Sequence, residues 1–215
     1  MNPRQSAPAM TASPCARDAI ASAAAPRMRG RRVASLLLFL GAVASAAWLR
    51  PVLAQSLTEY EIKAAFIYNF AKFVEWPASA FAQPQSRLIL CLIGKDVFGA
   101  ALDTIDHKLA QGHELQVRRQ VLLEEVKSCH ILFVSESERG NLAPIFRAVA
   151  GASVLSISDM DRFAEAGGMI GLYKVDNQVQ FAINLDAARD ASLQINSQLL
   201  KLARIIRRSA NEGGK

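Results

Sequence analysis

Residues 87–94, with the sequence RLILCLIG, form a near-continuous apolar run. Such a run is typical of a strand whose two faces are both buried in a parallel sheet. A second run of the same kind, CHILFVS, occupies residues 129–135. Two strands of this type indicate a sheet that is covered by other elements on both sides.

Shorter or more polar strands are predicted elsewhere in the chain. Residues 113–120 alternate between apolar and polar side chains, and 153–157 form a short apolar segment. Segments 168–174 and 178–185 flank Asp176-Asn177, and both of these residue types accept the positive φ of a tight turn. The last two segments therefore predict an antiparallel hairpin.

Helices are predicted between these strands. Residues 57–75 carry apolar side chains over an arc of roughly 200° on a helical wheel, which is wide for a helix lying on one sheet. This helix should end at Trp76, because Pro77 disfavours α geometry in the residue before it. Shorter helical segments are predicted over 97–108, 138–149, 159–166 and 197–208. The alternation predicts an α/β fold with a mainly parallel central sheet, helices on both faces and a C-terminal antiparallel hairpin.

The N-terminal segment has the organisation of a secretory signal peptide. Basic residues cluster in 27–32, an apolar stretch follows over 33–49, and Val52-Leu53-Ala54 resembles a cleavage site. We therefore expect residues 1–54 to be a signal peptide cleaved after Ala54, and residues 55–215 to be one exported, periplasmic domain. Two alternatives stay open: the apolar stretch is an uncleaved membrane anchor, or translation starts at Met28.

The positive charge of the chain belongs to this leader. The formal net charge of the 215 residues is +6, and residues 1–54 hold seven basic residues and one acidic residue. The remaining domain is therefore neutral overall. Because nucleic-acid binding depends on a basic surface that neutralises phosphates, we predict no nucleic-acid partner.

Two cysteines remain after the leader, Cys91 and Cys129. An even number in an oxidising compartment suggests one disulfide, and two buried free thiols are the alternative. Cys91 lies in the strand over 87–94, and Cys129 begins the strand over 129–135. If these strands are neighbours, the two cysteines can come within bridging distance.

No residue pattern indicates catalysis. His107, His113 and His130 are the only histidines, and none has a Cys, Asp or Glu at a metal-site spacing. The chain has no Gly-x-Ser-x-Gly elbow, and Gly94-Lys95 lacks the other residues of a phosphate-binding loop. We therefore predict no enzyme, no cofactor and no metal site. The glycine cluster at 167–171 is interpreted as a helix stop with close backbone packing, and a backbone surface for a partner is the alternative.

Several stretches between residues 57 and 207 carry a resemblance to a known family, and their order and number make the set specific. They are EIKAAF at 61–66, NFAKFVEWP at 69–77, LCLIG at 90–94, CHILFVS at 129–135, FA at 163–164 with GGMIG at 167–171, FAINL at 181–185 and LLKLAR at 199–204. Together they resemble the YfiR family of periplasmic regulators.

The resemblance implies a partner and an assembly. The best-understood members of this family bind the periplasmic sensor region of an inner-membrane diguanylate cyclase and hold it inactive, which lowers cyclic di-GMP and biofilm formation. They are α/β proteins that tend to form homodimers and carry disulfides, and Cys91 and Cys129 match bridged positions in such relatives. The mature chain has no further cysteine pair, so it departs from members that have a second bridge.

The first hypothesis is therefore a periplasmic regulatory protein that binds a membrane diguanylate cyclase or another membrane sensor. The wide apolar arc of helix 57–75 suggests a surplus that a dimer or a partner would bury. We expect Tyr68, Phe73 and Trp76 to contact the partner. Lys201, Arg204 and Arg208 would share one face of the last helix and form a second contact patch.

The alternative hypothesis is a small-ligand-binding module that serves a membrane kinase or receptor. In a parallel sheet the usual ligand site is a crevice at the C-terminal ends of the strands. The side chains expected there are those of Lys95, Asp96, Ser135 and Ser158.

Overall fold

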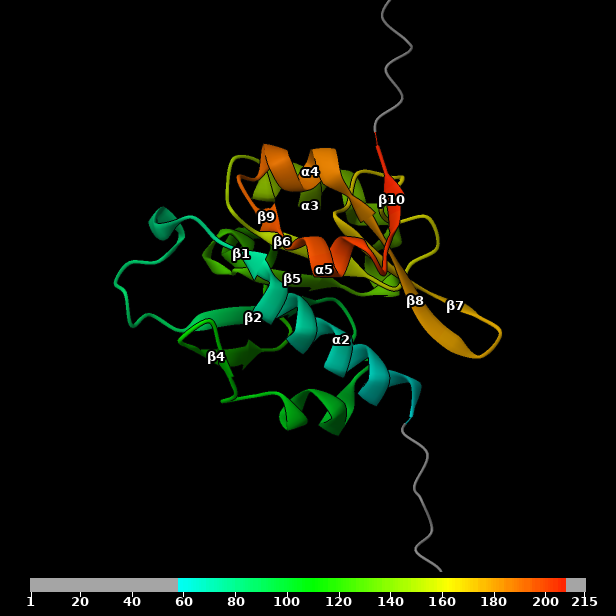
Figure 1. Ribbon diagram of the computed structural model, residues 1–215, viewed down its shortest axis with the longest axis horizontal. Coiled ribbons are helices and arrows are strands. Elements are labelled where there is room, and N and C mark those ends of the chain that lie inside the picture. Colours follow the sequence, from blue (N-terminus) through cyan, green and yellow to red (C-terminus); the bar gives the residue numbers. More distant parts are fainter. Residues whose placement is uncertain (1–57, 208–215) are drawn as a thin grey trace, which may run out of the picture. The chain divides into compact units, whose positions relative to one another are not determined.

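This computed structural model describes residues 58–207, so the predicted leader and Arg208 lie outside the described residues. An eight-stranded sheet with the order β10-β8-β7-β6-β5-β2-β4-β3 runs through the domain (Figure 1). All neighbouring strands are parallel except the pairs β7–β8 and β3–β4. The predicted fold class is confirmed. The strands are β2 (Leu88–Ile93), β3 (Leu109–Ala110), β4 (His113–Arg118), β5 (Ile131–Val134), β6 (Leu155–Ser158), β7 (Ile170–Val175), β8 (Gln178–Asn184) and β10 (Arg204–Ile206).

Helix α2 (Glu59–Phe73) lies across one face of this sheet (Figure 1). A capping box fixes its first turn: the Thr58 hydroxyl accepts a hydrogen bond from the Glu61 N–H, and the Glu61 carboxylate accepts one from the Thr58 N–H. The helix gives way to the short strand β1 (Val74–Glu75), which pairs antiparallel with β9 (Gln194–Ile195). The side of α2 that faces the sheet is fully buried and consists of Ala64, Ile67, Phe70 and Ala71.

The apolar side chains in the wide arc of α2 pack against other elements of the same domain. Besides the sheet, α2 contacts the 3₁₀ helix η2 (Gly99–Thr104) and helix α5 (Ser197–Leu200). The ring centroid of Tyr60 lies 5.3 Å from that of Phe98, and the ring centroid of Phe66 lies 5.5 Å from that of Phe181. These flanking elements account for the arc, so its width gives no independent sign of a dimer or partner surface.

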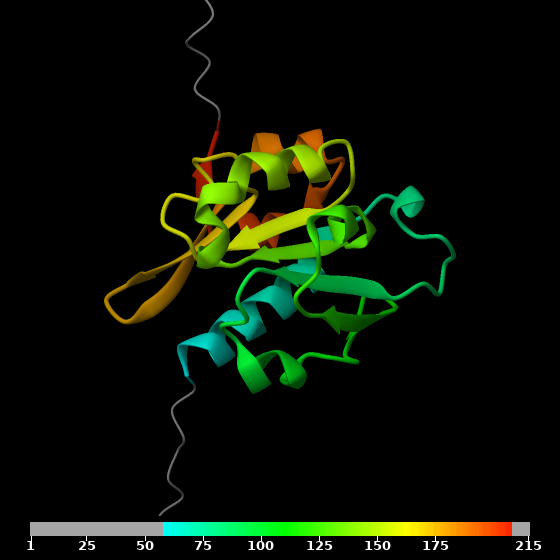
Figure 2. The ribbon, with the colours of Figure 1, turned by 180° about the vertical axis from the view of Figure 1, so that it is seen from behind.

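The opposite face of the sheet is covered by helix α3 (Leu142–Val149) and the 3₁₀ helix η3 (Leu123–Ser128) (Figure 2). The disulfide between Cys91 and Cys129 lies in this layer, with a Cα–Cα distance of 5.9 Å, as predicted. Both cysteines are buried. The layer forms a second core, in which buried side chains of α3 and η3 gather with those of β2 and β5.

The predicted helix over 197–208 is wrong. Helix α5 ends at Leu200, the chain turns through residues 201–203, and β10 then pairs parallel with β8. The β-branched Ile205 and Ile206 favour an extended backbone, and their pairing with β8 outweighs the helical spacing of the basic residues. Lys201 and Arg204 therefore share no helical face, and Arg208 lies outside the described residues.

Other predicted elements differ in extent. The segment 97–108 contains the short η2 followed by a turn over 105–107, and 159–166 forms hydrogen-bonded turns. Helix α3 begins later than predicted because the 3₁₀ helix η4 (Glu136–Asn141) precedes it. Pro144 lies in the first turn of α3, where proline is tolerated. Helix α4 (Leu185–Asp190) and the 3₁₀ helix η1 (Ala78–Ala80) were not predicted.

Candidate functional site

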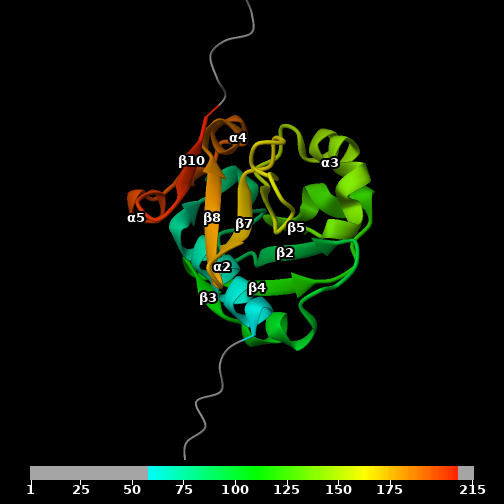
Figure 3. The same ribbon diagram turned by 90° about the vertical axis from the view of Figure 1, so that its right-hand side faces the viewer.

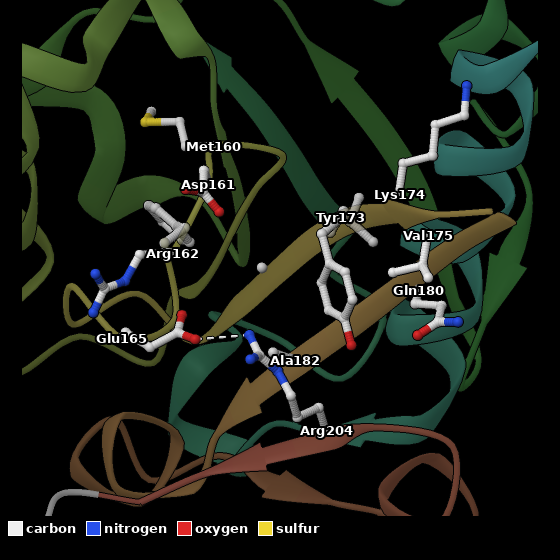
Figure 4. A pocket seen from close by; sticks show the side chains of 13 residues that line it. Met160, Asp161, Arg162, Glu165, Tyr173, Lys174, Val175, Gln180, Ala182 and Arg204 are labelled. Carbon is white, nitrogen blue, oxygen red and sulfur yellow. Dashed lines mark hydrogen bonds and ion pairs between the residues drawn. The ribbon is translucent and has the colours of Figure 1, made fainter. Parts of the chain in front are cut away.

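A groove of about 430 Å³ lies beside the β7–β8 hairpin (Figure 4). Its floor is formed by alternate residues of the two strands, Gly171 and Tyr173 of β7 with Gln180 and Ala182 of β8. The loop from Met160 to Glu165 forms one wall, and Arg204 of β10 forms the other.

The groove follows from the alternation of the hairpin. Ile170, Leu172, Phe181 and Ile183 point into the core under α2, so the residues between them point to the opposite face. On that face, the core under α3 includes side chains of β2 and β5 but none of β7, β8 or β10 among the described residues. The floor of the groove is therefore sheet surface that no helix within residues 58–207 covers.

Arg204 links the two sides of the groove. Its guanidinium donates a hydrogen bond to the Glu165 carboxylate at 2.7 Å, in an ion pair that joins residues 39 positions apart (Figure 4). The same guanidinium lies 5.1 Å from the ring centroid of Tyr173. The three side chains come from a loop and two strands and form a polar rim with an aromatic base, an arrangement suited to binding a carboxylate or a polypeptide.

The glycine cluster fixes the loop wall. A Cβ on Gly168 would lie 2.1 Å from Cε1 of Phe163, and one on Gly171 would lie 3.4 Å from the Ala164 nitrogen. The close approach to the Phe163 ring requires glycine at position 168, whereas a Cβ at 171 would make only an ordinary contact. The close packing expected for 167–171 is therefore found at Gly168, and the expected helix stop is not found because 159–166 forms turns.

Lys63 of α2 is a buried lysine whose amine lies near the C-terminal end of β6. The Lys63 Nζ atom of α2 lies 2.7 Å from both the Asp159 and the Glu59 carboxylates, and Lys174 of the hairpin pairs with Glu59 at 3.0 Å. Burial disfavours the charged amine, but the hydrogen bonds with Asp159 and Glu59 outweigh burial and raise the pKa of Lys63. This network ties α2 to the loop after β6 and to the hairpin, and so positions one end of the groove.

An aromatic stack occupies the N-terminal ends of the strands. The Phe81 ring lies between two imidazoles, with its centroid 3.9 Å from that of His113 and 4.6 Å from that of His130. His130 is buried and uses both ring nitrogens, since Nδ1 accepts from the Ile89 N–H at 3.0 Å and Nε2 donates to the Ala80 carbonyl at 3.1 Å. The stack holds the loop after α2 against β2, β4 and β5.

The predicted contact residues Tyr68, Phe73 and Trp76 are half-buried against the core under α2. The Tyr68 hydroxyl donates to the Leu109 carbonyl at 2.8 Å, and its ring lies under the amines of Lys72 and Lys108. The Trp76 indole nitrogen donates to the His130 carbonyl at 3.2 Å. Tyr68 and Trp76 therefore have clear structural roles, which any partner contact would have to share.

The predicted ligand crevice at the C-terminal ends of β2 and β5 is filled by protein. Asp96 accepts hydrogen bonds from the Phe98 and Gly99 N–H groups and pairs with Arg119, while Ser137 accepts from the Lys95 N–H at 2.9 Å. Ser158 donates to the Val134 carbonyl at 2.6 Å. Ser135 is fully buried, and its hydroxyl has no hydrogen-bond partner within residues 58–207. These four residues do not line the groove by the hairpin.

Sequence reasoning missed the groove because its key residues are distant in sequence. Nothing in the sequence pairs Glu165 with Arg204 or places Tyr173 beside them. The buried position of Lys63 could have been found from the sequence. On the helical wheel Lys63 lies within the apolar arc, between Phe70 and Val74. A lysine in that position needs a buried partner, which the structure identifies as Asp159.

Among residues 58–207, no group of three His, Cys, Asp or Glu side chains is arranged to hold a metal ion. None of the helices in that range is long and apolar enough to cross a membrane.

Comparison with known proteins gives distant structural matches, two of which are described here, and a family. A conserved domain protein from Vibrio cholerae O1 biovar El Tor is 11% identical with a TM-score of 0.46, and the match covers 71% of this chain and 61% of that one. The ABC domain in complex with L-Trp from Streptococcus pneumonia is 11% identical with a TM-score of 0.40, over 56% of this chain and 54% of that one. The chain thus spans less than two thirds of either protein. The family model described as YfiR/HmsC-like matches residues 60–204. The chain belongs to the YfiR/HmsC-like family.

Proposed function

We propose that this protein is a periplasmic repressor, which binds the outer sensor region of an inner-membrane diguanylate cyclase and holds the cyclase inactive. The observation that carries the proposal is the family match across residues 60–204, because the YfiR-like family is regulatory rather than catalytic. Binding would shift the sensor between active and inactive populations by its differential affinity for the two forms. Lower cyclic di-GMP and less biofilm would follow.

The site of action in this proposal is the periplasm, reached through a signal peptide cleaved after Ala54. The Cys91–Cys129 disulfide supports an oxidising compartment, because buried structural disulfides are rare in reducing cytoplasm. N-terminal sequencing of the exported protein tests the cleavage site. A first residue other than Gln55 would contradict it.

The contact surface in the proposal includes Tyr68, Phe73 and Trp76, with Lys201, Arg204 and Arg208 as a second region and a homodimer as the assembly. Among these residues, Arg204 is the best target for mutagenesis. Its side chain is 55% exposed and does not support the core, so its substitution should affect binding without disturbing packing. Substitutions of the half-buried aromatic residues would disturb packing as well as binding.

A second candidate function is a small-ligand-binding module that serves a membrane kinase or receptor. The groove by the hairpin favours it, since a volume of about 430 Å³ with Arg204, Tyr173 and Gln180 at its lining suits a small polar anion. A thermal-shift screen of periplasmic metabolites tests it. The candidate requires a ligand that raises the melting temperature of the wild type and fails to raise that of Arg204→Ala.

Deletion and complementation of the gene test the repressor proposal. Cells lacking the protein should contain more cyclic di-GMP than the parent, measured by mass spectrometry, and the exported wild-type chain should restore the lower level. A complementing copy without residues 1–54 is the matched control, because it should stay in the cytoplasm and restore nothing. Unchanged cyclic di-GMP in the deletion strain would contradict the proposal.

A further inference from the structure

Strand β10 ends the sheet with an open edge. It pairs with β8 on one side, and no strand within residues 58–207 pairs with its other side (Figure 3). No hydrogen bond from the loops or side chains of the described residues reaches the backbone of Arg204–Ile206 either. An edge of this kind offers a row of N–H and C=O groups to an added strand.

The other edge of the sheet, formed by β3, is less open to an added strand. There β3 has only two residues, and the Tyr68 hydroxyl donates to the Leu109 carbonyl. The contrast marks β10 as the edge that can take another strand.

The side chains around β10 specify the chemistry of that strand. Lys201, Arg204 and Arg207 are exposed, and the segment 201–207 has no acidic residue. Apolar side chains lie among them, since Leu202 is 76% exposed and Ile205 is 36% exposed. Arg204 points to the groove, and Ile205 points to the α2 face by the alternation of the strand.

The charges argue against a second copy of this chain as the occupant. Two copies of β10 paired with each other would bring the exposed Lys201, Arg204 and Arg207 of both chains together, and like charges on paired strands are destabilising. An acidic strand would instead be attracted to the edge, and its carboxylates could bond the forked guanidinium of Arg204.

We infer that β10 binds an extended, acidic segment of the partner protein, which adds to the sheet as its next strand. One carboxylate of that segment takes the place of Glu165 at Arg204, beside Tyr173. Backbone hydrogen bonds supply affinity and the alternate side chains supply specificity, as in other cases of strand addition. The inference names the recognition mode of the proposed repressor and rests on that function for its biological meaning.

Synthetic peptides test the inference without the membrane partner, so this test and the test of the proposed function can fail separately. The probe is a short fluorescent peptide that alternates valine and glutamate. One control peptide replaces glutamate with lysine, and a second replaces every other valine with proline, which keeps the charge and prevents strand pairing. Fluorescence anisotropy with the exported wild-type protein measures binding.

The expected result is binding of the acidic alternating peptide and of neither control. Hydrogen exchange at Arg204–Ile206 should slow in the complex, because the outer N–H groups of β10 become bonded. Arg204→Glu should weaken binding by about tenfold or more, while Arg139→Glu, a matched charge reversal on η4, should leave it unchanged.

Four results would overturn the inference. If the proline-containing peptide bound as tightly as the acidic alternating peptide, binding would depend on charge alone and not on strand addition. If the acidic alternating peptide did not bind, β10 would not be a peptide-binding site. A change in self-association of Arg204→Glu, measured by analytical ultracentrifugation, would assign the edge to a second copy. Binding of wild type but not Arg204→Glu to phosphatidylglycerol vesicles, without peptide binding, would assign it to a lipid surface.

Discussion

The Trp76 indole nitrogen donates a hydrogen bond to the carbonyl oxygen of His130 at 3.2 Å, which joins the end of α2 to the start of β5. The same carbonyl accepts from the Leu155 N–H, and the His130 ring bonds Ile89 and Ala80. His130 is thus a buried junction between two strands and the loop after α2. Protonation of the His130 imidazole would place a hydrogen on Nδ1, which could then no longer accept the hydrogen bond from the Ile89 N–H.

We predict that stability decreases on acidification because of His130. Burial lowers the pKa of His130 in the folded state, so below about pH 6.5 the unfolded chain binds a proton more readily than the folded one. The free energy of unfolding should therefore fall as the pH drops from 6.5 toward the folded pKa. Urea unfolding followed by fluorescence measures it, since Trp76 is the only tryptophan after residue 54.

Two variants separate His130 from the exposed histidine His107. The pKa of His107 is raised by its hydrogen bond with Glu114, so its stabilising effect is lost as pH rises, which is the opposite direction. His107→Gln should keep the acid sensitivity, and His130→Gln should flatten it. An unchanged pH slope in His130→Gln would refute the assignment.

The buried Lys63 should make a large contribution to stability. Lys63→Met leaves the Asp159 and Glu59 carboxylates without their shared cation, and we expect a loss of about 2–4 kcal/mol in the free energy of unfolding. Replacing both partners, as in Lys63→Met with Asp159→Leu, should recover part of this loss. Lys174→Met is the control, because its pair with Glu59 is exposed and should contribute less than about 1 kcal/mol. Equal losses for Lys63→Met and Lys174→Met would argue against the buried network.

Removal of the disulfide should destabilise the domain by about 4 kcal/mol, the chain-entropy value for closing a loop with a sequence separation of 38. Chemical denaturation of Cys91→Ala/Cys129→Ala measures the loss. The folded wild type should resist reduction by external thiols, since both cysteines are buried. Rapid reduction of the native protein, or an unchanged denaturation midpoint in the double variant, would be at odds with this account.

The filled crevice at the end of β2 can be tested with two glycines. Gly94 and Gly112 have φ angles of 87° and 84°, so Gly→Ala at either one carries a similar backbone cost of about 1 kcal/mol. A Cβ on Gly94 would also lie 2.5 Å from the Ser137 hydroxyl, whereas nothing lies within 4 Å at Gly112. Gly94→Ala should therefore cost about 1–2 kcal/mol more than Gly112→Ala in urea unfolding. Equal costs would indicate that η4 yields readily and that the crevice can open.

These results show where sequence reasoning works in this fold. The buried strands β2 and β5 were predictable because each is apolar on both faces, and the hairpin because Asp176-Asn177 allow its turn. In both cases a local pattern has one structural solution. The even number of cysteines suggested the disulfide, which forms because β2 and β5 are neighbours and Cys129 lies two residues before β5.

The last segment was mispredicted because two local patterns compete there. Lys201, Arg204 and Arg208 have helical spacing, while Ile205-Ile206 favours a strand, and the choice depends on the open side of β8 far away in sequence. The groove was unpredictable for a related reason. The ion pair of Glu165 with Arg204 exists only after β10 has joined the sheet.

The central claim, that the protein holds a membrane signalling protein inactive by binding it, is tested most directly by capture of that protein. The tagged mature chain is incubated with detergent-solubilised membranes, and the retained proteins are identified by mass spectrometry, with an unrelated exported protein carrying the same tag as control. The account predicts specific recovery of a membrane protein with a diguanylate cyclase domain. Recovery of a membrane kinase or transporter instead, or of no membrane protein above the control, would contradict it.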